Sequence, residues 1–277
     1  MRYLMSSEYL FNGLSEYDTP ADAPRSVAFR LLLKSRWYFY WKIFSVFRES
    51  GRMGRLGKLD AEMQIRLSSC NLRLVERCGG TVHLRGLDNL RALNMRPVVM
   101  VGNHMSLLET GLFHAVMRPY VDFAFVVKKS LMSTPFFKDI LATLGVIPVS
   151  RTNPREDLKT ILTEGKRILE SGKSMIVFPQ ATRSRELDPE HFNSIGVKLA
   201  RAAGVPVVPF ALKTDFLDQG KVLRSFGPIH PRRDVWFDFG EAMEITGHGQ
   251  EEQQKIIDFI APRLREWRRL EAEKGID

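Results

Sequence analysis

A histidine and a carboxylate lie five positions apart in the stretch VGNHMSLLET, residues 101–110. His104 follows the apolar run 97–102, and Glu109 is the first acidic residue after it. An imidazole backed by a carboxylate can take a proton from a hydroxyl group, and the carboxylate then stabilises the imidazolium that forms. The same pattern is also typical of a polar turn between a strand and a helix, and this stretch by itself fits both interpretations.

Basic residues follow other apolar runs in the same way. Lys128 ends one run, Arg151 closes GVIPVSR, and Arg183 lies in FPQATRSR. Ligand sites in α/β sheets form where strands end and loops begin, so we expect these clusters to share a face with His104. Lysine and arginine there would bind an anionic group such as a phosphate. Lys129 is an alternative to Lys128 for this role.

Motifs for other kinds of catalysis are missing from the sequence. It has no nucleophile-elbow serine, Walker loop or dinucleotide-binding glycine fingerprint. The histidines are scattered and no C-x-x-C pattern occurs, so we expect no metal site. The residues therefore indicate a hydroxyl activated beside an anion, without a covalent enzyme intermediate.

Apolar runs alternate with helical patterns along most of the chain. The runs expected to form strands are residues 81–86, 97–102, 122–128, 145–150, 174–179, 206–212 and 234–243. The segments expected to form helices are residues 59–78, 155–171, 194–203 and 251–273. Fully apolar strands alternating with helices predict an α/β fold, with a mostly parallel central sheet flanked by helices.

The N-terminal part, residues 1–57, is predicted to be a helical segment distinct from a main domain of residues 58–277. Its stretch 27–47 is rich in aromatic and aliphatic residues but contains four Lys or Arg residues, so it does not fit a membrane-spanning helix. Aromatic rings beside cations are typical of the membrane interface. The alternative is a helix packed on the main domain. The glycine-punctuated stretch 51–58 is predicted to be a linker.

Charge and cysteine content bear on partners and location. The formal net charge of +9 suggests a polyanionic partner, either nucleic acid or an anionic membrane surface, and no nucleic-acid-binding signature is present. Cys70 and Cys78 are too far apart on one helix to form a disulfide, so we expect free thiols and a reducing compartment. The N-terminus lacks the layout of a secretory signal. We expect a peripheral protein on the cytoplasmic face of a membrane.

Four blocks taken together resemble the glycerolipid acyltransferase family, which includes the 1-acylglycerol-3-phosphate (lysophosphatidate) acyltransferases. The family's blocks have the form NHxSxxD, GxIxxxR, FPEGTRS and a proline-flanked strand similar to VPVVP. In this chain they are, in the same order, NHMSLLE (103–109), GVIPVSR (145–151), FPQATRS (178–184) and VPVVPF (205–210). The resemblance covers roughly residues 81–212, and it makes 58–277 the expected acyltransferase domain.

The resemblance implies transfer of a fatty acyl group from acyl carrier protein or coenzyme A to the hydroxyl of a lysophospholipid-like acceptor, with lysophosphatidate as the leading candidate. No cofactor is implied beyond this thioester co-substrate. His104 would be the general base and Glu109 would orient it. The residues implied to bind substrate are Asn103, Ser106, Lys128, Arg151, Gln180, Thr182, Arg183 and Ser184. Alternatives are another lipid hydroxyl as acceptor, or a non-catalytic lipid-binding relative.

Several positions depart from the family pattern. Glu109 replaces an aspartate, Gln180 and Ala181 replace Glu and Gly, and Asn193 stands where the family often has lysine. Residues five apart lie about 140° apart around a helix, so His104 must precede the helix from which Glu109 reaches back. The longer glutamate should preserve the chemistry, whereas the changes in the third block affect the expected identity of the acceptor.

Overall fold

The computed structural model describes residues 10–134, 137–180, 182–220 and 226–276. Residues 1–9 of the predicted N-terminal segment and Ala181 of the third block lie outside this part. An eight-stranded sheet runs through the described residues in the order β1-β2-β8-β7-β3-β6-β4-β5. Its strands are β1 (Tyr17–Asp18), β2 (Val82–Arg85), β3 (Val99–Gly102), β4 (Phe123–Lys128), β5 (Ile147–Val149), β6 (Ser174–Val177), β7 (Val207–Lys213) and β8 (Val235–Phe239).

Most neighbouring strands are parallel. The β2–β8, β3–β6, β3–β7, β4–β5 and β4–β6 pairs are parallel, while β1–β2 and β7–β8 are antiparallel. All residues of β3, β6 and β7 are buried, because helices cover both faces of the sheet there. The predicted mostly parallel α/β fold is confirmed.

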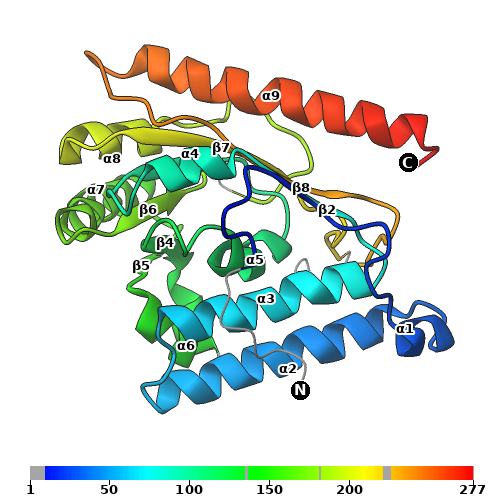
Figure 1. The fold of residues 1–277 in the computed structure, drawn as a ribbon. Helices are drawn as coiled ribbons and strands as arrows, with labels where there is room; N and C mark the ends of the chain where they lie inside the picture. Colours follow the sequence, from blue (N-terminus) through cyan, green and yellow to red (C-terminus); the bar gives the residue numbers. More distant parts are fainter. Residues whose placement is uncertain (1–9, 135–136, 181, 221–225, 277) are drawn as a thin grey trace.

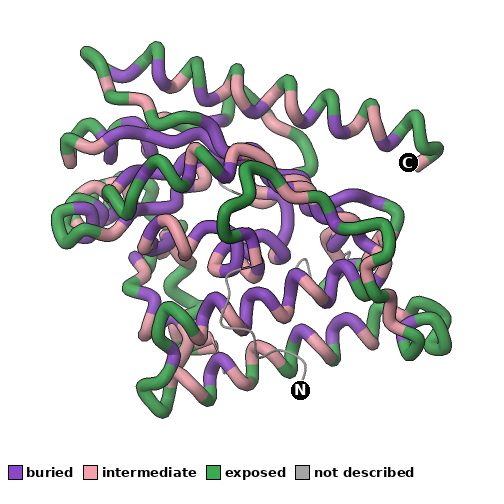
Figure 2. The backbone as a smooth tube through the Cα atoms, in the orientation of Figure 1, coloured by how far each residue is buried: buried purple, intermediate pink, exposed green. Residues whose placement is uncertain are grey.

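Helices form layers on the two faces of the sheet (Figure 1). One face carries α7 (Pro154–Glu170), α8 (Ile195–Ala203) and α9 (Gln250–Glu273), and the other carries α5 (Leu108–Val116), followed outward by α3 (Ala61–Arg77) and α2 (Arg36–Arg55). The remaining helices are α1 (Val27–Leu31), α4 (Leu87–Ala92), the 3-10 helix Lys129–Ser133 and α6 (Phe137–Leu144). Buried residues concentrate in the sheet and on the inward sides of these helices (Figure 2).

The aromatic N-terminal stretch forms two helices, α1 and α2, instead of one. Leu33 and Lys34 between them adopt positive φ angles of 52° and 56°, which ends α1. Side chains on one side of α2 pack on the main domain: the Phe39 ring lies 5.8 Å from that of Phe216, and the Tyr40 hydroxyl donates to the Gly227 carbonyl at 2.7 Å.

The predicted linker at residues 51–58 is wrong for its first half, because α2 continues to Arg55. Gly51 is buried, and a Cβ atom on Gly54 would lie 2.6 Å from the backbone oxygen of Asp139 in α6. Glycines within a regular helix thus allow a neighbouring helix to approach closely. Composition alone does not distinguish such glycines from those of a flexible turn.

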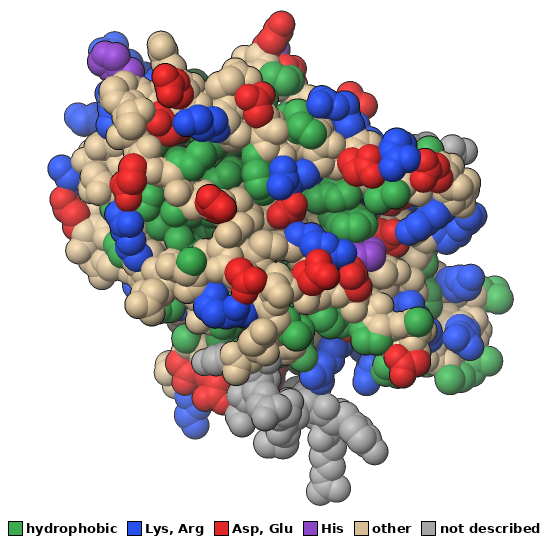
Figure 3. Space-filling model, turned by 45° about the horizontal axis from the view of Figure 1, so that its top comes forward, with side chains coloured by type: hydrophobic (Ala, Val, Ile, Leu, Met, Phe, Trp, Pro, Cys, Tyr) green, Lys and Arg blue, Asp and Glu red, His purple; other side chains and the backbone are tan. Residues whose placement is uncertain are grey.

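The described helices include none with the length and apolar character needed to cross a membrane. The face covered by α9 carries basic and acidic side chains intermixed (Figure 3). Several of them pair, including Arg269 with Glu266 at 2.7 Å and Arg263 with Asp238 at 2.5 Å. The net positive charge is therefore not gathered into a single-sign patch on this face.

Candidate active site

His104 and Glu109 form a hydrogen-bonded pair where β3 gives way to α5. His104 lies in the loop after β3, and Glu109 lies in the first turn of α5, so the two side chains meet although they are five positions apart. The His104 Nδ1 atom is 2.7 Å from Glu109 Oε1. Glu109 is fully buried, whereas the His104 side chain keeps 14% of its surface exposed.

Glu109 accepts hydrogen bonds from several protein groups besides His104. The backbone N–H groups of Met105 and Ser106 donate to it at 2.8 and 2.9 Å, and the Thr214 hydroxyl also donates. Burial by itself raises the pKa of Glu109, but the hydrogen bond and the charge of His104, with the Thr214 and Met105 bonds, outweigh it and lower this pKa below the ordinary value. Glu109 is therefore an ionised carboxylate at neutral pH.

An ionised Glu109 fixes the tautomer of His104. The carboxylate can only accept, so the Nδ1–H of His104 must donate to it, and the lone pair of Nε2 is left to accept a proton. The Phe178 ring stacks on the imidazole, with a centroid distance of 4.1 Å and an interplanar angle of 21°. The ring plane is thus held by Phe178 on one side and by the carboxylate at its edge, as a general base requires.

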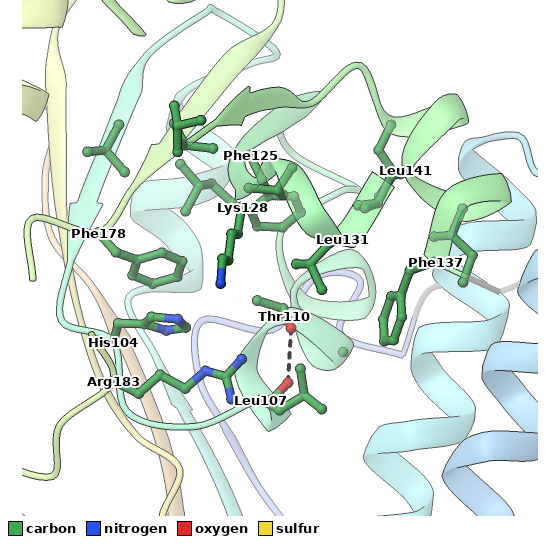
Figure 4. A pocket seen from close by; sticks show the side chains of 18 of the residues that line it. His104, Leu107, Thr110, Phe125, Lys128, Leu131, Phe137, Leu141, Phe178 and Arg183 are labelled. Carbon is green, nitrogen blue, oxygen red and sulfur yellow. Dashed lines mark hydrogen bonds between the residues drawn. The ribbon is translucent and has the colours of Figure 1, made fainter. Parts of the chain in front are cut away.

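Three predicted cations line the same pocket as His104: Lys128, Arg151 and Arg183. Lys128 and Arg183 point into the space in front of the imidazole from different sides (Figure 4). Burial lowers the pKa of Arg183, Glu109 opposes this shift, and Arg151 adds to it. A guanidinium stays protonated under such shifts, so the space beside His104 has a positive potential suited to an anion.

Arg151 is held by the first turn of α7. It has a positive φ of 62°, which is uncommon for a residue with a side chain. Asp157 stabilises this turn by accepting from the N–H groups of Ser150 and Arg151 at 2.8 and 2.7 Å. Strained backbone of this kind persists where the surroundings determine it, and here it directs a cation to the pocket.

The pocket beside His104 has a volume of about 600 Å³. Its wall is mostly apolar and is built by α2, α3, α5, α6 and β4, with Phe47, Leu107, Phe125, Leu131 and Leu141 among its residues. In Figure 4 the apolar side chains extend to one side of His104, away from Phe178. A cavity of this kind fits an alkyl chain whose reactive end lies at the imidazole.

Other predicted site residues lie around this centre, not all in the pocket. Gln180 and Thr182 belong to the pocket lining. Asn103 is buried and bonds the backbone of Leu212 with both its amide groups, at 2.8 and 2.9 Å. Ser106 is buried against Glu109 and Thr214, and the Ser184 N–H donates to the His104 carbonyl at 2.9 Å. These contacts fix the loop that carries His104.

Thr214 is a residue of the site that sequence reasoning missed. It follows β7, is completely buried, and its hydroxyl bonds both Glu109 and Ser106. On either side of it, Lys213 and Asp215 form a buried ion pair at 2.7 Å. The sequence contained a signal for Thr214, because it is a polar residue directly after a buried strand, which is the criterion that selected His104.

Among the described residues, no His, Cys, Asp or Glu cluster is arranged to hold a metal ion.

Comparison with known proteins places these residues in a family. Residues 81–213 match the model of the acyltransferase family. The 1-acyl-sn-glycerol-3-phosphate acyltransferase of Pseudomonas aeruginosa is 33% identical over 128 residues, which are 46% of this chain and 48% of that protein. Over these residues the chain is similar to the glycerolipid acyltransferases. The match contains all four sequence blocks, and with them His104 and Glu109, and it ends one residue before Thr214.

Two further members of the family extend the comparison. A 1-acyl-sn-glycerol-3-phosphate acyltransferase of Borreliella burgdorferi is 27% identical over 181 residues, 60% of this chain and 66% of that protein. The crystal structure of the 1-acyl-sn-glycerophosphate (LPA) acyltransferase PlsC from Thermotoga maritima matches with a TM-score of 0.62 and 20% identity, over 87% of this chain and 97% of that one. The fold is thus that of a solved acyltransferase, while the chain spans about half the length of the P. aeruginosa relative.

Proposed function

We propose that this protein is an O-acyltransferase that moves a fatty acyl group from a thioester, acyl carrier protein or coenzyme A, to the hydroxyl of lysophosphatidate. The observation that carries the proposal is the His104–Glu109 pair at 2.7 Å, at one end of an apolar pocket lined by Lys128, Arg151 and Arg183. Proteins named as 1-acyl-sn-glycerol-3-phosphate acyltransferases are similar to this chain over its acyltransferase part, which supports the same acceptor.

The reaction needs one proton carrier. The acceptor hydroxyl gives its proton to Nε2 of His104 while its oxygen attacks the thioester carbonyl, and Glu109 stabilises the imidazolium. The C–S bond then breaks, and the imidazolium returns the proton to the leaving thiolate. The cations hold the acceptor's phosphate, and the apolar pocket holds the acyl chain. Holding both substrates in place supplies much of the remaining acceleration.

A second acceptor is favoured by one feature. Gln180 lines the pocket as a neutral amide where the family has a glutamate, so the charge beside the acceptor differs from the family pattern. A lyso-lipid with another headgroup, or a hydroxylated lipid, is the alternative acceptor for the same chemistry.

Mass spectrometry of the products tests the function. The purified protein is incubated with a panel of lyso-lipids and with either acyl carrier protein or coenzyme A thioesters. We expect phosphatidate as the main product, and His104→Ala should reduce its formation by about 10²–10⁴-fold, as for the loss of a general base. No turnover of lysophosphatidate alongside turnover of another lipid would select the alternative acceptor, and thiol release that survives His104→Ala would contradict the assigned base.

The lipid acceptor is reached from an anionic membrane surface, with the protein peripheral on the cytoplasmic face. Support comes from the α1–α2 corner, where large apolar side chains are exposed: Leu31, Leu33, Trp37 and Trp41 are 77%, 92%, 69% and 65% exposed. Cations lie among them, and Lys42 Nζ stands 4.5 Å from the Trp41 ring centre. Aromatic and basic side chains together suit the headgroup region of a bilayer.

A further inference from the structure

Gln180 makes two hydrogen bonds that link distant parts of the site. Its Oε1 atom accepts from the backbone N–H of His104 at 3.0 Å, and its Nε2 group donates to the backbone carbonyl of Glu186 at 3.1 Å. Both partners are main-chain atoms, so each has a fixed role as donor or acceptor. These roles also determine which way the amide faces.

The glutamine amide supplies both an acceptor for the His104 N–H and a donor for the Glu186 carbonyl. A glutamate, the family's residue here, could accept from His104 but as a carboxylate could not donate to Glu186. Asn193, the other position that departs from the family by losing a charge, behaves similarly, because its Nδ2 group donates to the Pro179 carbonyl. Both departures therefore place an amide where it donates to a backbone carbonyl, that of Pro179 in the third block or that of Glu186 just after it.

Two more side chains donate to backbone carbonyls near Glu186, in the segment Thr182–Glu186. Gln219 donates to the carbonyl of Arg183 at 3.0 Å, and Arg268 donates to that of Arg185. The segment is also tied directly to the base, because the Ser184 N–H donates to the His104 carbonyl at 2.9 Å. Both backbone polar groups of His104 are thus bonded to the third block, one through Gln180 and one through Ser184.

We propose that Gln180 is a positioning residue that closes the segment Thr182–Glu186 and ties it to His104, thereby fixing the place of Arg183 relative to the base. The bond to His104 positions the base, and the bond to Glu186 positions the cation that holds the acceptor. The kinetic part of this inference rests on the proposed function. A displacement of about 1 Å in such a site costs roughly 10²-fold in rate. Because the two bonds position different groups, the loss of each bond should have its own kinetic effect.

Two variants separate the bonds, since Gln180→Glu and Gln180→Met nearly match glutamine in length. Gln180→Glu keeps the acceptor for His104 and loses the donor to Glu186, so we expect the KM for the acceptor to rise about three- to tenfold with kcat within about threefold. Gln180→Met loses both bonds, so kcat should also fall roughly ten- to 100-fold. Gln254→Met on the surface of α9, where the amide donates to Asp258 at 2.9 Å, is the matched control and should leave both constants unchanged.

Hydrogen–deuterium exchange tests the same bonds without turnover. The His104 N–H should exchange as slowly in Gln180→Glu as in the wild type, and at least about tenfold faster in Gln180→Met, because only methionine removes its acceptor. A Gln180→Met protein with wild-type exchange and kinetics would overturn the proposal, as would equal kinetic losses in the two variants. Protection at His104 in a wild-type protein that acylates no lipid would contradict the proposed function and leave the positioning role of Gln180 intact.

If Gln180→Met does not fold, Gln219→Met tests the segment through another bond. Gln219 donates to the carbonyl of Arg183, and it makes no bond to His104 in the described structure. We expect the acceptor KM to rise about three- to tenfold with kcat preserved. A wild-type KM in this variant would overturn the link between the fixed segment and the position of Arg183.

Discussion

At the scale of single residues, the site is determined by how Glu109 is held. A glutamate replaces the family's aspartate, yet its longer side chain still reaches His104 because hydrogen bonds from Met105, Ser106 and Thr214 fold it back towards the loop. Burial raises the pKa of Glu109, but the hydrogen bond and charge of His104, together with the bonds from Thr214 and Met105, lower it and keep the carboxylate ionised. The unusual residue in the first block is therefore accommodated by its surroundings.

Replacing Thr214 by valine should expose this dependence. Valine removes the hydroxyl that donates to Glu109, and a hydrogen bond to a buried carboxylate contributes about 1.5–3 kcal/mol, so the free energy of unfolding at pH 7 should fall by that amount. The pKa of Glu109 is lower in the folded than in the unfolded protein, so its contribution to stability is present above the unfolded pKa and is lost as pH falls through the folded pKa.

The difference between wild type and Thr214→Val should therefore shrink in acid, which denaturant unfolding from pH 7 to about pH 3, below the ordinary pKa of a glutamate, would measure. Thr214→Ser keeps the hydroxyl and is the matched control. A difference that stays constant with pH would show that valine acts through packing and not through the carboxylate.

At the scale of elements, the pocket depends on how closely α2 and α6 approach. Gly54 permits this contact, and a Cβ atom there would come within 2.6 Å of the Asp139 backbone oxygen, so one helix must shift to admit alanine. Arg55 and Asp139 add a surface ion pair at 2.6 Å. The wall of the pocket formed by Phe47 and Leu141 belongs to these two helices.

Gly54→Ala should therefore be destabilising although alanine is the better helix former. Overpacking costs about 1–3 kcal/mol and the gain in helix propensity returns about 1 kcal/mol, so we expect a net loss of up to about 2 kcal/mol in the free energy of unfolding. Denaturant unfolding measures it, with Ser45→Ala on the exposed side of α2 as the control. A Gly54→Ala protein more stable than the wild type would mean that α6 moves away without cost.

At the scale of the whole molecule, exposed apolar and basic side chains concentrate at the α1–α2 corner. Trp37 and Trp41 are largely exposed there, beside Lys34, Arg36 and Lys42. Elsewhere, on the face covered by α9, charges of both signs are interspersed (Figure 3). The corner therefore differs from the face covered by α9 in a way that suits an anionic bilayer.

Sedimentation with vesicles tests this surface. The wild type should bind vesicles containing anionic phospholipid and release as salt rises, because screening weakens attraction between exposed charges. The double variant Trp37→Ala/Trp41→Ala should bind at least about tenfold more weakly, since each buried ring contributes roughly 1.5–3 kcal/mol. Arg265→Gln, which removes a cation from the exposed side of α9, should leave vesicle binding nearly unchanged. Unchanged binding by the double variant would locate the membrane contact elsewhere.

The sequence by itself determined the alternation of strands and helices, the His104–Glu109 pair and the group of cations Lys128, Arg151 and Arg183. The strands and helices follow from local rules, because apolar runs and strand ends act between neighbours in the chain, whereas the pair and the cations were singled out by four ordered blocks that resemble those of the family. Only the tertiary structure decided that Thr214 touches Glu109, that Gly54 lies inside a helix, and that Gln180 bonds His104 and Glu186. Most of these contacts join residues far apart in sequence, and the order and register of the strands alone bring them together.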